Sequence, residues 1–365
     1  MKENDDFFVF LFAKTGESSI LSYKEVLVEK VDQMLIQLKA DLNSGKYQGN
    51  RRFPSEYELA ERFGVNKKTA NKAVSLLVAD GWLYRGKRGQ GTMVSPVKPF
   101  PGGYLLCISQ VENQYQAKFL KGVQAAAFQN DYLLSYTNPP PEKLNSLLDR
   151  LNNSPVRGIV TGYYGKLKTS LPTVYIDRIE SANDVPFYSV SCNNYQGGYD
   201  IMKLLISRGH KNIVIFNMHD LMPERLFGFQ DAMKEAGFQD ISKRVFKWQD
   251  ISNYEAEKQT RSVFRKFPET TAIACASDDL MLHAIAAMDH QGIDWKYKIA
   301  ITGFGNLLGT NTLLPVASVD QHPYNLGFTA VENLIALIEK RGEEVPLKSV
   351  LDAEIINAGN IPLLQ

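Results

Sequence analysis

From residue 104 to the C-terminus, short apolar runs alternate with longer stretches whose apolar residues recur at helical spacing. Runs at 173–176, 213–216 and 272–276 have the length and composition of buried strands, and stretches such as 326–339 have the period of helices. Repeated strand and helix units predict parallel sheets that are covered by helices on both faces. Because about 260 residues is large for one such sheet, we expect residues 104–365 to form a two-lobed α/β domain.

The N-terminal quarter of the chain has a different pattern, in which helix signals come first. Residues 27–42 carry an apolar stripe at helical spacing. A second helix is predicted from Ser55, because Ser55 and Glu58 have the Ser-x-x-Glu spacing of a capping box. Gly64 then predicts a turn, and Asn66 is a suitable cap for a third helix that runs to about residue 79.

Two short runs follow the third helix, at 82–84 and 92–94, and they flank a tip rich in Gly, Lys and Arg. This order predicts a β-hairpin, or wing. We therefore expect an α+β winged helix-turn-helix domain over residues 26–95. Residues 1–25 have no clear period and are interpreted as an N-terminal extension. The best linker is 96–103, because SPVKPFPGG at 95–103 holds three prolines and two glycines.

The charge of the chain is distributed unevenly. Residues 50–92 carry nine Lys and Arg against four Asp and Glu, whereas the remainder carries 32 against 36 and a net charge of −4. A basic module on a mildly acidic body indicates a local contact with a polyanion.

The third helix places its basic residues on one face. At 100° per residue, Ala70, Val74 and Leu77 fall on one side, and Lys68 and Lys72 fall on the other. Any surface helix has a charged face opposite its core face, so the helix alone favours a solvated surface. The preceding helix and turn, the wing, and the absence of acidic residues between 67 and 79 change this balance toward DNA, since the second helix of such a unit enters the major groove.

The motifs of this region also resemble a known family. FPSEYELAERFGVNKKTA, followed by ADGWL and GQGTMV, is similar to the winged-helix domain of GntR-family bacterial repressors, and the resemblance covers about residues 27–95. It departs from the family pattern where arginines are usual, at Tyr57, Lys67 and Asn71, and where serine is usual, at Asn66. Because Lys is a point donor and Asn prefers adenine, we expect an unusual DNA site.

The candidate DNA-binding residues lie on the second helix, the third helix and the wing. Lys67 and Asn71 are the predicted base readers, whereas Lys68, Thr69, Lys72, Arg85 and Arg88 are predicted to contact phosphates. The full set is Ser55, Glu56, Tyr57, Asn66, Lys67, Lys68, Thr69, Asn71, Lys72, Arg85, Lys87, Arg88, Gly89 and Gln90.

In the two-lobed domain, a ligand is expected in a cleft where the carboxyl ends of strands meet. The candidates are polar or aromatic residues just after predicted strands, although for each of them a loop or capping role is the simpler interpretation. Asp278 in particular is suited to cap its own helix. The set is Tyr115, Tyr163, Asp177, Arg178, Asn193, Arg225, Ser277, Asp278, Asn306 and Gln321.

Residues 104–365 resemble the effector-binding domain of LacI/GalR regulators, which is similar to periplasmic sugar-binding proteins. The motifs that carry the resemblance are Asn194-x-x-Gly-Gly, the RGHK motif at 208–211, Arg225-x-x-Gly-Phe, and Ala-Ser-Asp at 276–278. A GntR-like reader joined to this domain looks like the AraR type of sugar-responsive repressor.

The resemblance implies that Arg225 holds ligand hydroxyls or a carboxylate, that Asp177 lines the cleft, and that Gln321 lies at a crossover between lobes. Two hydroxyl-binding groups of the family are missing, because Ser277 and Gly305 stand where Asn and Asp are usual. Either Asn306 or Asp279 replaces them, or the ligand is not a common pentose or hexose.

Other classes of protein are disfavoured by absent signals. The sequence has no GxxxxGK[ST], HExxH, GxSxG or paired CxxC motif, and its five histidines show no metal spacing. Its three cysteines lie apart in or beside apolar runs, which indicates buried free thiols. No run approaches the ~20 apolar residues of a membrane span. FFVFLFA at 7–13 is short, follows acidic residues and lacks a basic start, so we expect a cytoplasmic protein without membrane contact.

The sequence therefore predicts a ligand-responsive transcriptional regulator, a repressor in preference to an activator. It is expected to need no cofactor or metal. Its expected partners are double-stranded operator DNA, a sugar or related polyol or sugar acid, and a second copy of the chain in a homodimer. The alternatives are a small-molecule sensor that does not read DNA and, more weakly, a cytoplasmic enzyme of the same α/β fold.

Overall fold

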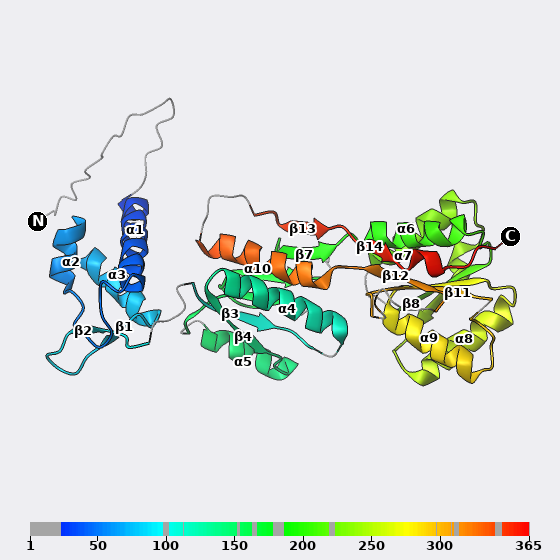
Figure 1. Ribbon diagram of the computed structural model, residues 1–365, viewed down its shortest axis with the longest axis horizontal. Helices are drawn as coiled ribbons and strands as arrows, with labels where there is room; N and C mark the ends of the chain where they lie inside the picture. Colours follow the sequence, from blue (N-terminus) through cyan, green and yellow to red (C-terminus); the bar gives the residue numbers. More distant parts are fainter. Residues whose placement is uncertain are drawn as a thin grey trace, which may run out of the picture. The chain divides into compact units, whose positions relative to one another are not determined.

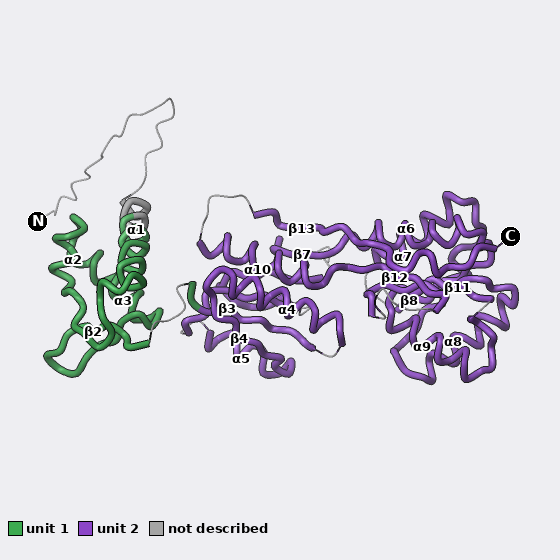
Figure 2. Tube along the Cα trace, viewed as in Figure 1, with its two compact units in different colours: residues 1–103 green, residues 104–365 purple. Residues whose placement is uncertain are grey.

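The computed structural model gives a backbone for most of the chain and side chains from residue 30 onward. The described residues are 23–97, 102–111, 113–151, 154–162, 166–177, 186–218, 223–296, 298–307, 309, 314–339 and 345–364. The chain divides into two compact units, unit 1 (residues 1–103) and unit 2 (residues 104–365) (Figure 2). Nearly all of the predicted N-terminal extension, 1–25, lies outside the described residues.

The described part of unit 1 contains three helices followed by a two-stranded hairpin. The elements are α1 (Tyr23–Asn43), α2 (Glu56–Phe63), α3 (Lys67–Ala79), β1 (Leu83–Arg85) and β2 (Thr92–Val94). Strands β1 and β2 pair antiparallel. The apolar stripes of the helices meet in a core that includes Leu38, Leu59, Leu77 and Trp82. The predicted winged helix-turn-helix fold is confirmed.

The helix boundaries of unit 1 follow from their caps. The Ser55 side chain accepts a hydrogen bond from the Glu58 backbone N–H while the Glu58 carboxylate accepts from the Ser55 N–H, so the predicted capping box is present. Gly64 ends α2 in the left-handed conformation, with φ 60°. Asn66 caps α3 by accepting from the Thr69 N–H at 2.8 Å. Gly64 and Asn66 therefore determine where α2 ends and where α3 begins.

An ion pair joins α1 to α2. Arg62 donates to the buried Asp41 carboxylate at 2.6 Å, and Lys46 reaches the same oxygen at 3.1 Å. Burial alone would raise the pKa of Asp41, but the hydrogen bonds from Arg62, Lys46 and Gln37 outweigh burial and lower the pKa.

Unit 2 consists of two lobes, each built on a twisted sheet with helices on both faces (Figure 1). The sheet of the first lobe has the order β13-β7-β6-β5-β3-β4. Its elements are β3 (Gly103–Ile108), α4 (Gln114–Gln129), β4 (Tyr132–Thr137), α5 (Pro141–Leu151), β5 (Val156–Thr161), β6 (Thr173–Ile176), β7 (Tyr188–Cys192), α10 (Pro323–Glu339) and β13 (Lys348–Leu351).

The second lobe has the sheet order β14-β12-β11-β10-β8-β9. Its elements are α6 (Asn194–Ser207), β8 (Ile213–Met218), α7 (Pro223–Glu235), β9 (Val245–Trp248), α8 (Asn253–Lys266), β10 (Ala272–Cys275), α9 (Asp278–His290), β11 (Ala300–Phe304), β12 (Val316–Asp320) and β14 (Glu354–Ile356). The α/β class is confirmed, with one correction. Strand β14 pairs antiparallel to β12, so this sheet is not wholly parallel.

The chain passes between the two lobes at three places in the described residues. It leaves the first lobe between β7 and α6, returns between β12 and α10, and leaves again between β13 and β14. These crossings make the lobes one connected unit rather than two successive domains. They also place residues 192–194 and 320–323 at the junction of the lobes.

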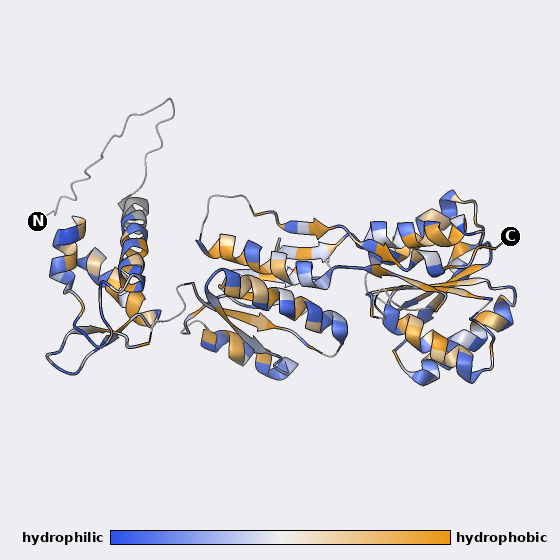
Figure 3. Ribbon diagram, in the orientation of Figure 1, coloured by the Kyte–Doolittle hydropathy of each residue, from blue (hydrophilic) through white to orange (hydrophobic). Residues whose placement is uncertain are grey.

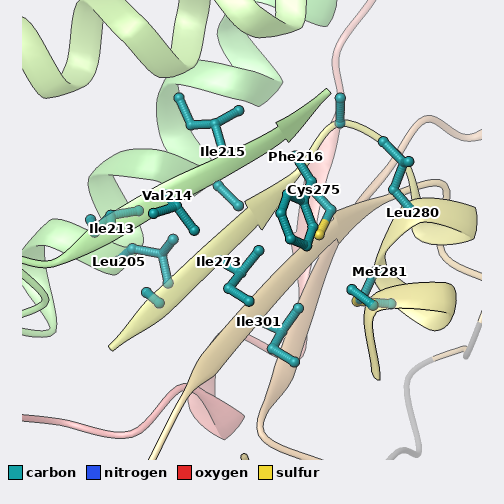
Figure 4. Close-up of a cluster of buried hydrophobic side chains, with 14 of the residues drawn as sticks. Leu205, Ile213, Val214, Ile215, Phe216, Ile273, Cys275, Leu280, Met281 and Ile301 are labelled. Carbon is teal, nitrogen blue, oxygen red and sulfur yellow. The ribbon is translucent and has the colours of Figure 1, made fainter. Parts of the chain in front are cut away.

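The apolar strands lie in the middle of each lobe, and the outer faces of the helices are polar (Figure 3). In the second lobe, α6 and α9 cover opposite faces of the sheet, and their apolar side chains meet those of β8, β10 and β11 (Figure 4). Cys107, Cys192 and Cys275 are buried free thiols, as expected. These apolar cores support the ends of the strands, which the candidate ligand residues follow.

Glycines allow two helix pairs to pack at backbone distance. A Cβ on Gly122 of α4 would lie 1.9 Å from the Tyr324 carbonyl oxygen of α10, and one on Gly327 of α10 would lie 2.1 Å from the Phe119 oxygen. The α6 and α7 pair uses Gly198 and Gly228 in the same way, with distances of 2.4 and 2.2 Å to backbone oxygens. The sequence motifs Asn-x-x-Gly-Gly and Arg-x-x-Gly-Phe therefore serve helix packing.

Replacing Gly122 with alanine is expected to destabilise unit 2. The added methyl group meets backbone that cannot move alone, so α4 and α10 must separate, at a cost of about 1–3 kcal/mol. Chemical unfolding of the purified chain measures this loss. Gly359→Ala is the matched control, because a Cβ there meets nothing within 4 Å. Equal stability of the two variants would contradict the packing argument.

Candidate functional site

The exposed face of α3 is basic and polar, as the sequence predicts. Lys67, Lys68, Asn71 and Lys72 are exposed, whereas Ala70, Ala73, Val74 and Leu77 are buried against α1 and α2. The first turn of α3 has no acidic residue. Because the N-terminus of a helix carries partial positive charge, each lysine there costs about 0.3–1 kcal/mol. A bound anion such as a phosphate would remove that cost.

The wing presents a second group of basic residues. Lys87, Arg88, Gly89 and Gln90 are exposed at its tip, where Gly89 has φ 89° and the Gln90 side chain accepts from the Lys87 N–H at 3.0 Å. Arg85 is held at the base of the wing. It donates to Glu56 at 3.1 Å and to the Thr92 hydroxyl at 2.6 Å. The wing is therefore tied to the start of α2.

Three of the predicted DNA-binding residues have structural roles. Thr69 is only 3% exposed, and its hydroxyl donates to the Asn66 side chain at 2.9 Å, so it completes the cap of α3 and does not present its side chain to DNA. Ser55 and Asn66 use their side-chain oxygens as helix caps. Tyr57, at 68% exposure, lies beside Lys67, whose Nζ is 3.8 Å from the ring centroid.

A cavity of about 210 Å³ lies between the lobes of unit 2. The first lobe contributes Asn113, Tyr115 and Asp177, and Gln321 comes from a crossing segment. The second lobe contributes the remaining lining residues, which are Asn217, Met218, Arg225, Ile251, Ala276, Ser277, Asp278, Asp279, Leu280, Phe304, Gly305 and Leu307. The cavity is therefore lined by residues near the strand ends of both sheets.

Arg225 is fixed at the centre of the cavity wall. It is 7% exposed, and its three nitrogens donate to Asn194 Oδ1, to the Ala276 carbonyl and to Gln321 Oε1, each at 2.8 Å. Its guanidinium lies 3.8 Å from the Phe304 ring centroid. Three of its five N–H groups are used in these bonds, which leaves two donors for a ligand.

Two residues of the cavity lining each have a buried side-chain oxygen without a partner among the described residues. The two atoms are Asp177 Oδ1 and Asn217 Oδ1. The other Asp177 oxygen accepts a hydrogen bond from the Tyr115 hydroxyl. Burial raises the pKa of Asp177, although the Tyr115 hydrogen bond and the charge of Arg225 oppose the rise. An unpaired buried acceptor is costly, so both atoms favour a ligand that supplies donors.

Asp278 and Ser277 hold the cavity wall in place. The two Asp278 oxygens accept from the Leu307 N–H at 2.6 Å and from the Ser318 hydroxyl at 2.7 Å. Burial raises the pKa of Asp278, and these hydrogen bonds oppose that effect. Ser277, not Asp278, caps α9 by accepting from the Leu280 N–H. Both residues line the cavity, but their oxygens already have protein partners.

The remaining predicted residues fall outside this cavity lining or outside the described chain. Asn193 caps α6, and its neighbour Asn194 makes the contact with Arg225. Asn306 donates to Asp320 at 2.6 Å and does not line the cavity. Tyr163 and Arg178 lie outside the described residues.

Sequence reasoning missed Asn217 and Phe304. Asn217 is the polar residue within the apolar strand IVIFNM, a signal that was available. Phe304 gives no such signal, because an aromatic residue at a strand end is typical of a core.

The described part of the chain contains no group of three or more His, Cys, Asp or Glu side chains arranged to hold a metal ion. None of the helices described there has both the length and the hydrophobicity to cross a membrane.

Residues 30–94 match the gntR family of bacterial regulatory proteins, and residues 202–357 match the periplasmic binding protein-like domain. The chain joins a GntR-type winged helix-turn-helix domain to a periplasmic-binding-protein-like domain. The resemblances found in the sequence are thereby confirmed.

Curated relatives match most of the chain. The arabinose metabolism transcriptional repressor of Geobacillus stearothermophilus is 24% identical over 348 residues, which cover 87% of this chain and 93% of the relative. A regulator named RegA from Clostridium saccharobutylicum is 26% identical over 69% of this chain and 79% of its own length. These relatives are transcriptional regulators, and the chain carries the domains of a ligand-responsive transcriptional repressor.

Solved structures show the same fold. The complex of the transcriptional regulator CelR with cellobiose has a TM-score of 0.61 at 18% identity, over 83% of this chain and 98% of that one. The transcription regulator CcpA of Lactococcus lactis has a TM-score of 0.60 at 24% identity, over 70% of this chain and 97% of that one.

Binding of the chain to duplex DNA is expected to weaken steeply with salt. Four exposed basic side chains on α3 and the wing, those of Lys68, Lys72, Lys87 and Arg88, are placed to displace counterions from phosphates, so affinity should fall about 10²-fold or more between 50 and 200 mM salt. Fluorescence anisotropy with labelled DNA measures the slope. Lys68→Ala should reduce the slope by about one, whereas Lys211→Ala, an exposed lysine of unit 2, should leave it unchanged. A flat salt profile would exclude a groove-docked basic helix.

Asp177→Asn is expected to stabilise the ligand-free chain at pH 7. Because the folded-state pKa of Asp177 is raised, its contribution to stability is present below the unfolded value of 3.8 and is lost as pH rises through the folded pKa. Removing the buried charge should therefore add about 1 kcal/mol at pH 7. Asn also tolerates the backbone of this residue, which has φ 52°.

The pH dependence of unfolding provides the test of this expectation. The advantage of Asp177→Asn over the wild type should shrink as the pH falls toward 4. Asp240→Asn is the matched control, since Asp240 has φ 55° but a side chain that is 66% exposed. A loss of stability at pH 7 in Asp177→Asn alone would show that the ionised carboxylate is favourable in the fold.

Proposed function

We propose that this protein is a transcriptional repressor that binds operator DNA through α3 and the wing and releases it when a small polyhydroxylated molecule enters the cavity of unit 2. One observation carries the proposal. Asp177 and Asn217, which line the cavity, each keep a buried side-chain oxygen without a partner among the described residues, and Arg225 in the same lining uses only three of its five N–H groups. In a ligand-responsive repressor, the cavity would bind the ligand and the exposed basic helix would bind DNA.

The cavity favours an uncharged ligand. Asp177, Asp278 and Asp279 line it together with one guanidinium, that of Arg225. A sugar hydroxyl can donate to Asp177 or Asn217 and accept from Arg225, so a neutral sugar or polyol satisfies all three groups. A phosphate or a carboxylate would bring like charge near three carboxylates. The relatives named for arabinose metabolism and the cellobiose complex support a carbohydrate ligand.

The lobes provide the proposed switch. A ligand that contacts Asp177 of the first lobe and Arg225 of the second stabilises one arrangement of the lobes over others. Two copies of unit 2 pair as a homodimer in this proposal, and the lobe arrangement sets the spacing of the two winged helices on a pseudo-palindromic site in the cytoplasm. Coupling is reciprocal, so DNA lowers ligand affinity by the factor by which ligand lowers DNA affinity.

A thermal-shift screen of the full chain tests the proposal. Neutral sugars and polyols are compared with their phosphorylated and carboxylated analogues. A ligand at about 100 times its Kd adds about 2.7 kcal/mol to folding stability, which is a readily measured shift. We expect the hit to be neutral and its phosphorylated analogue to bind at least about 100-fold more weakly. The hit should also release the chain from DNA in an anisotropy assay.

Arg225→Ala should abolish the ligand-induced shift while the chain still binds DNA. Arg261→Ala, whose side chain is 70% exposed on α8, is the matched control and should keep the shift. A shift that survives in Arg225→Ala would place the ligand elsewhere. Equal DNA affinity with and without a tight ligand would reject the switch.

A further inference from the structure

Tyr57 and Lys67 form a stacked pair on the surface of unit 1. Tyr57 is the second residue of α2, and Lys67 is the first residue of α3. The Lys67 ammonium lies 3.8 Å from the centroid of the Tyr57 ring, well inside the ~6 Å limit of a cation–π contact. The ring has no core function, because Tyr57 is 68% exposed and does not belong to the hydrophobic cluster of unit 1.

The carboxylate of Glu56, the residue before Tyr57, adds a negative charge near Lys67. Hydrogen bonding to backbone lowers the pKa of Glu56, and the Arg85 ion pair and the charge of Lys67 lower it further. Glu56 is itself fixed, since its carboxylate accepts from Arg85 at 3.1 Å, and Arg85 is held by Thr92 at 2.6 Å. The wing is therefore joined to the start of α2 through Arg85 and Glu56, and the start of α2 contacts the start of α3 through Tyr57 and Lys67.

Such a contact matters because a lysine side chain is flexible. It has four rotatable bonds and a compact, strongly hydrated charge, so by itself it selects phosphate oxygens as readily as base atoms. A ring that holds the ammonium in one place removes most of that freedom before DNA arrives. The next residue, Lys68, has no aromatic contact among the described residues, and it is exposed.

We propose that Tyr57 is a positioning residue for DNA recognition, whose ring directs the Lys67 ammonium toward an acceptor on the edge of one base instead of toward a phosphate. This inference rests on the proposed function, since it assumes that α3 enters the major groove of DNA. Lys67 donates to that base in the complex. Tyr57 acts through Lys67 by holding its side chain in one direction.

The test is selection from a random duplex DNA library by the full-length chain without effector, followed by sequencing. The variants are Lys67→Ala, Tyr57→Leu and Tyr57→Gln, which remove the ammonium or the ring, and Tyr57→Phe, which keeps the ring and removes the hydroxyl. Lys68→Ala serves as the neighbouring-lysine control. Tyr254→Leu, at an exposed tyrosine of unit 2, is the control for the Tyr-to-Leu change.

We expect Lys67→Ala to reduce discrimination at one base position of each half-site about three- to tenfold. Tyr57→Leu and Tyr57→Gln should relax that same position, and Tyr57→Phe should preserve its base preference. The double variant Tyr57→Leu with Lys67→Ala should lose no more discrimination than Lys67→Ala alone. Lys68→Ala should weaken binding to all sequences alike, with a shallower salt slope.

Several outcomes would overturn the inference. One is unchanged preference at the Lys67 position in both ring-less variants, and another is a Tyr57→Phe variant that behaves like Tyr57→Leu, which would indicate a hydroxyl contact. If Lys67→Ala changes no position while the wild type still selects a motif, this inference fails and the proposed function stands. If the wild type selects no motif at all, both fail.

Discussion

The guanidinium of Arg225 joins four parts of unit 2 that are far apart in the sequence. It donates to Asn194 at the start of α6, to the carbonyl that follows β10, and to Gln321 between β12 and α10, and it stacks on Phe304 at the end of β11. Asn194 and Gln321 belong to two of the three segments that cross between the lobes. One side chain therefore fixes the mouth of the second lobe and two crossing segments together.

Stability and ligand binding make opposite demands on the same cavity. Full pairing of the polar groups around Arg225 would stabilise the ligand-free chain, but it would leave nothing for a ligand to bind. Instead, Asp177 Oδ1 and Asn217 Oδ1 remain unpartnered among the described residues, while both oxygens of Asp278 are used to hold the wall. The hydrogen bonds of Asp278 support the cavity wall, whereas Asp177 and Asn217 keep a side-chain oxygen that can still accept a hydrogen bond.

Local sequence signals predicted those features that depend on local physics. The caps at Ser55 and Asn66 and the alternation of strands and helices require only neighbouring residues, and the structure confirms them. Strands β9, β12, β13 and β14 were not predicted from the sequence. Strands β9, β13 and β14 each contain a charged residue, so they lack the continuous apolar run of a buried strand. The direction of β14, antiparallel to β12, follows from a crossing between lobes that no local pattern encodes.

The strand-end rule located the cavity but could not separate its working groups from their neighbours. It selected Asp177, Arg225 and Gln321, which line the cavity, and also Asn306, which does not. Hydrogen-bond partners do not separate Asp177 from Asn306, because each has one bonded side-chain atom, to Tyr115 or to Asp320, and one oxygen without a partner among the described residues. What differs is their position relative to the cavity. Asn217 was missed because the rule considers residues after a strand, and Asn217 lies within one.

The basic face of α3 is also a compromise between stability and binding. Lysines at the first two positions of the helix oppose its dipole, and the cap at Asn66 and the ring of Tyr57 offset that cost. Tyr57 and Lys67 both stand where arginines are usual in the GntR pattern. In this chain the Tyr57 ring and the Lys67 ammonium attract one another. Tyr57 and Lys67 therefore favour one another at these two positions. Together they replace two guanidinium groups, each able to donate two parallel hydrogen bonds, with a single ammonium group held in one direction.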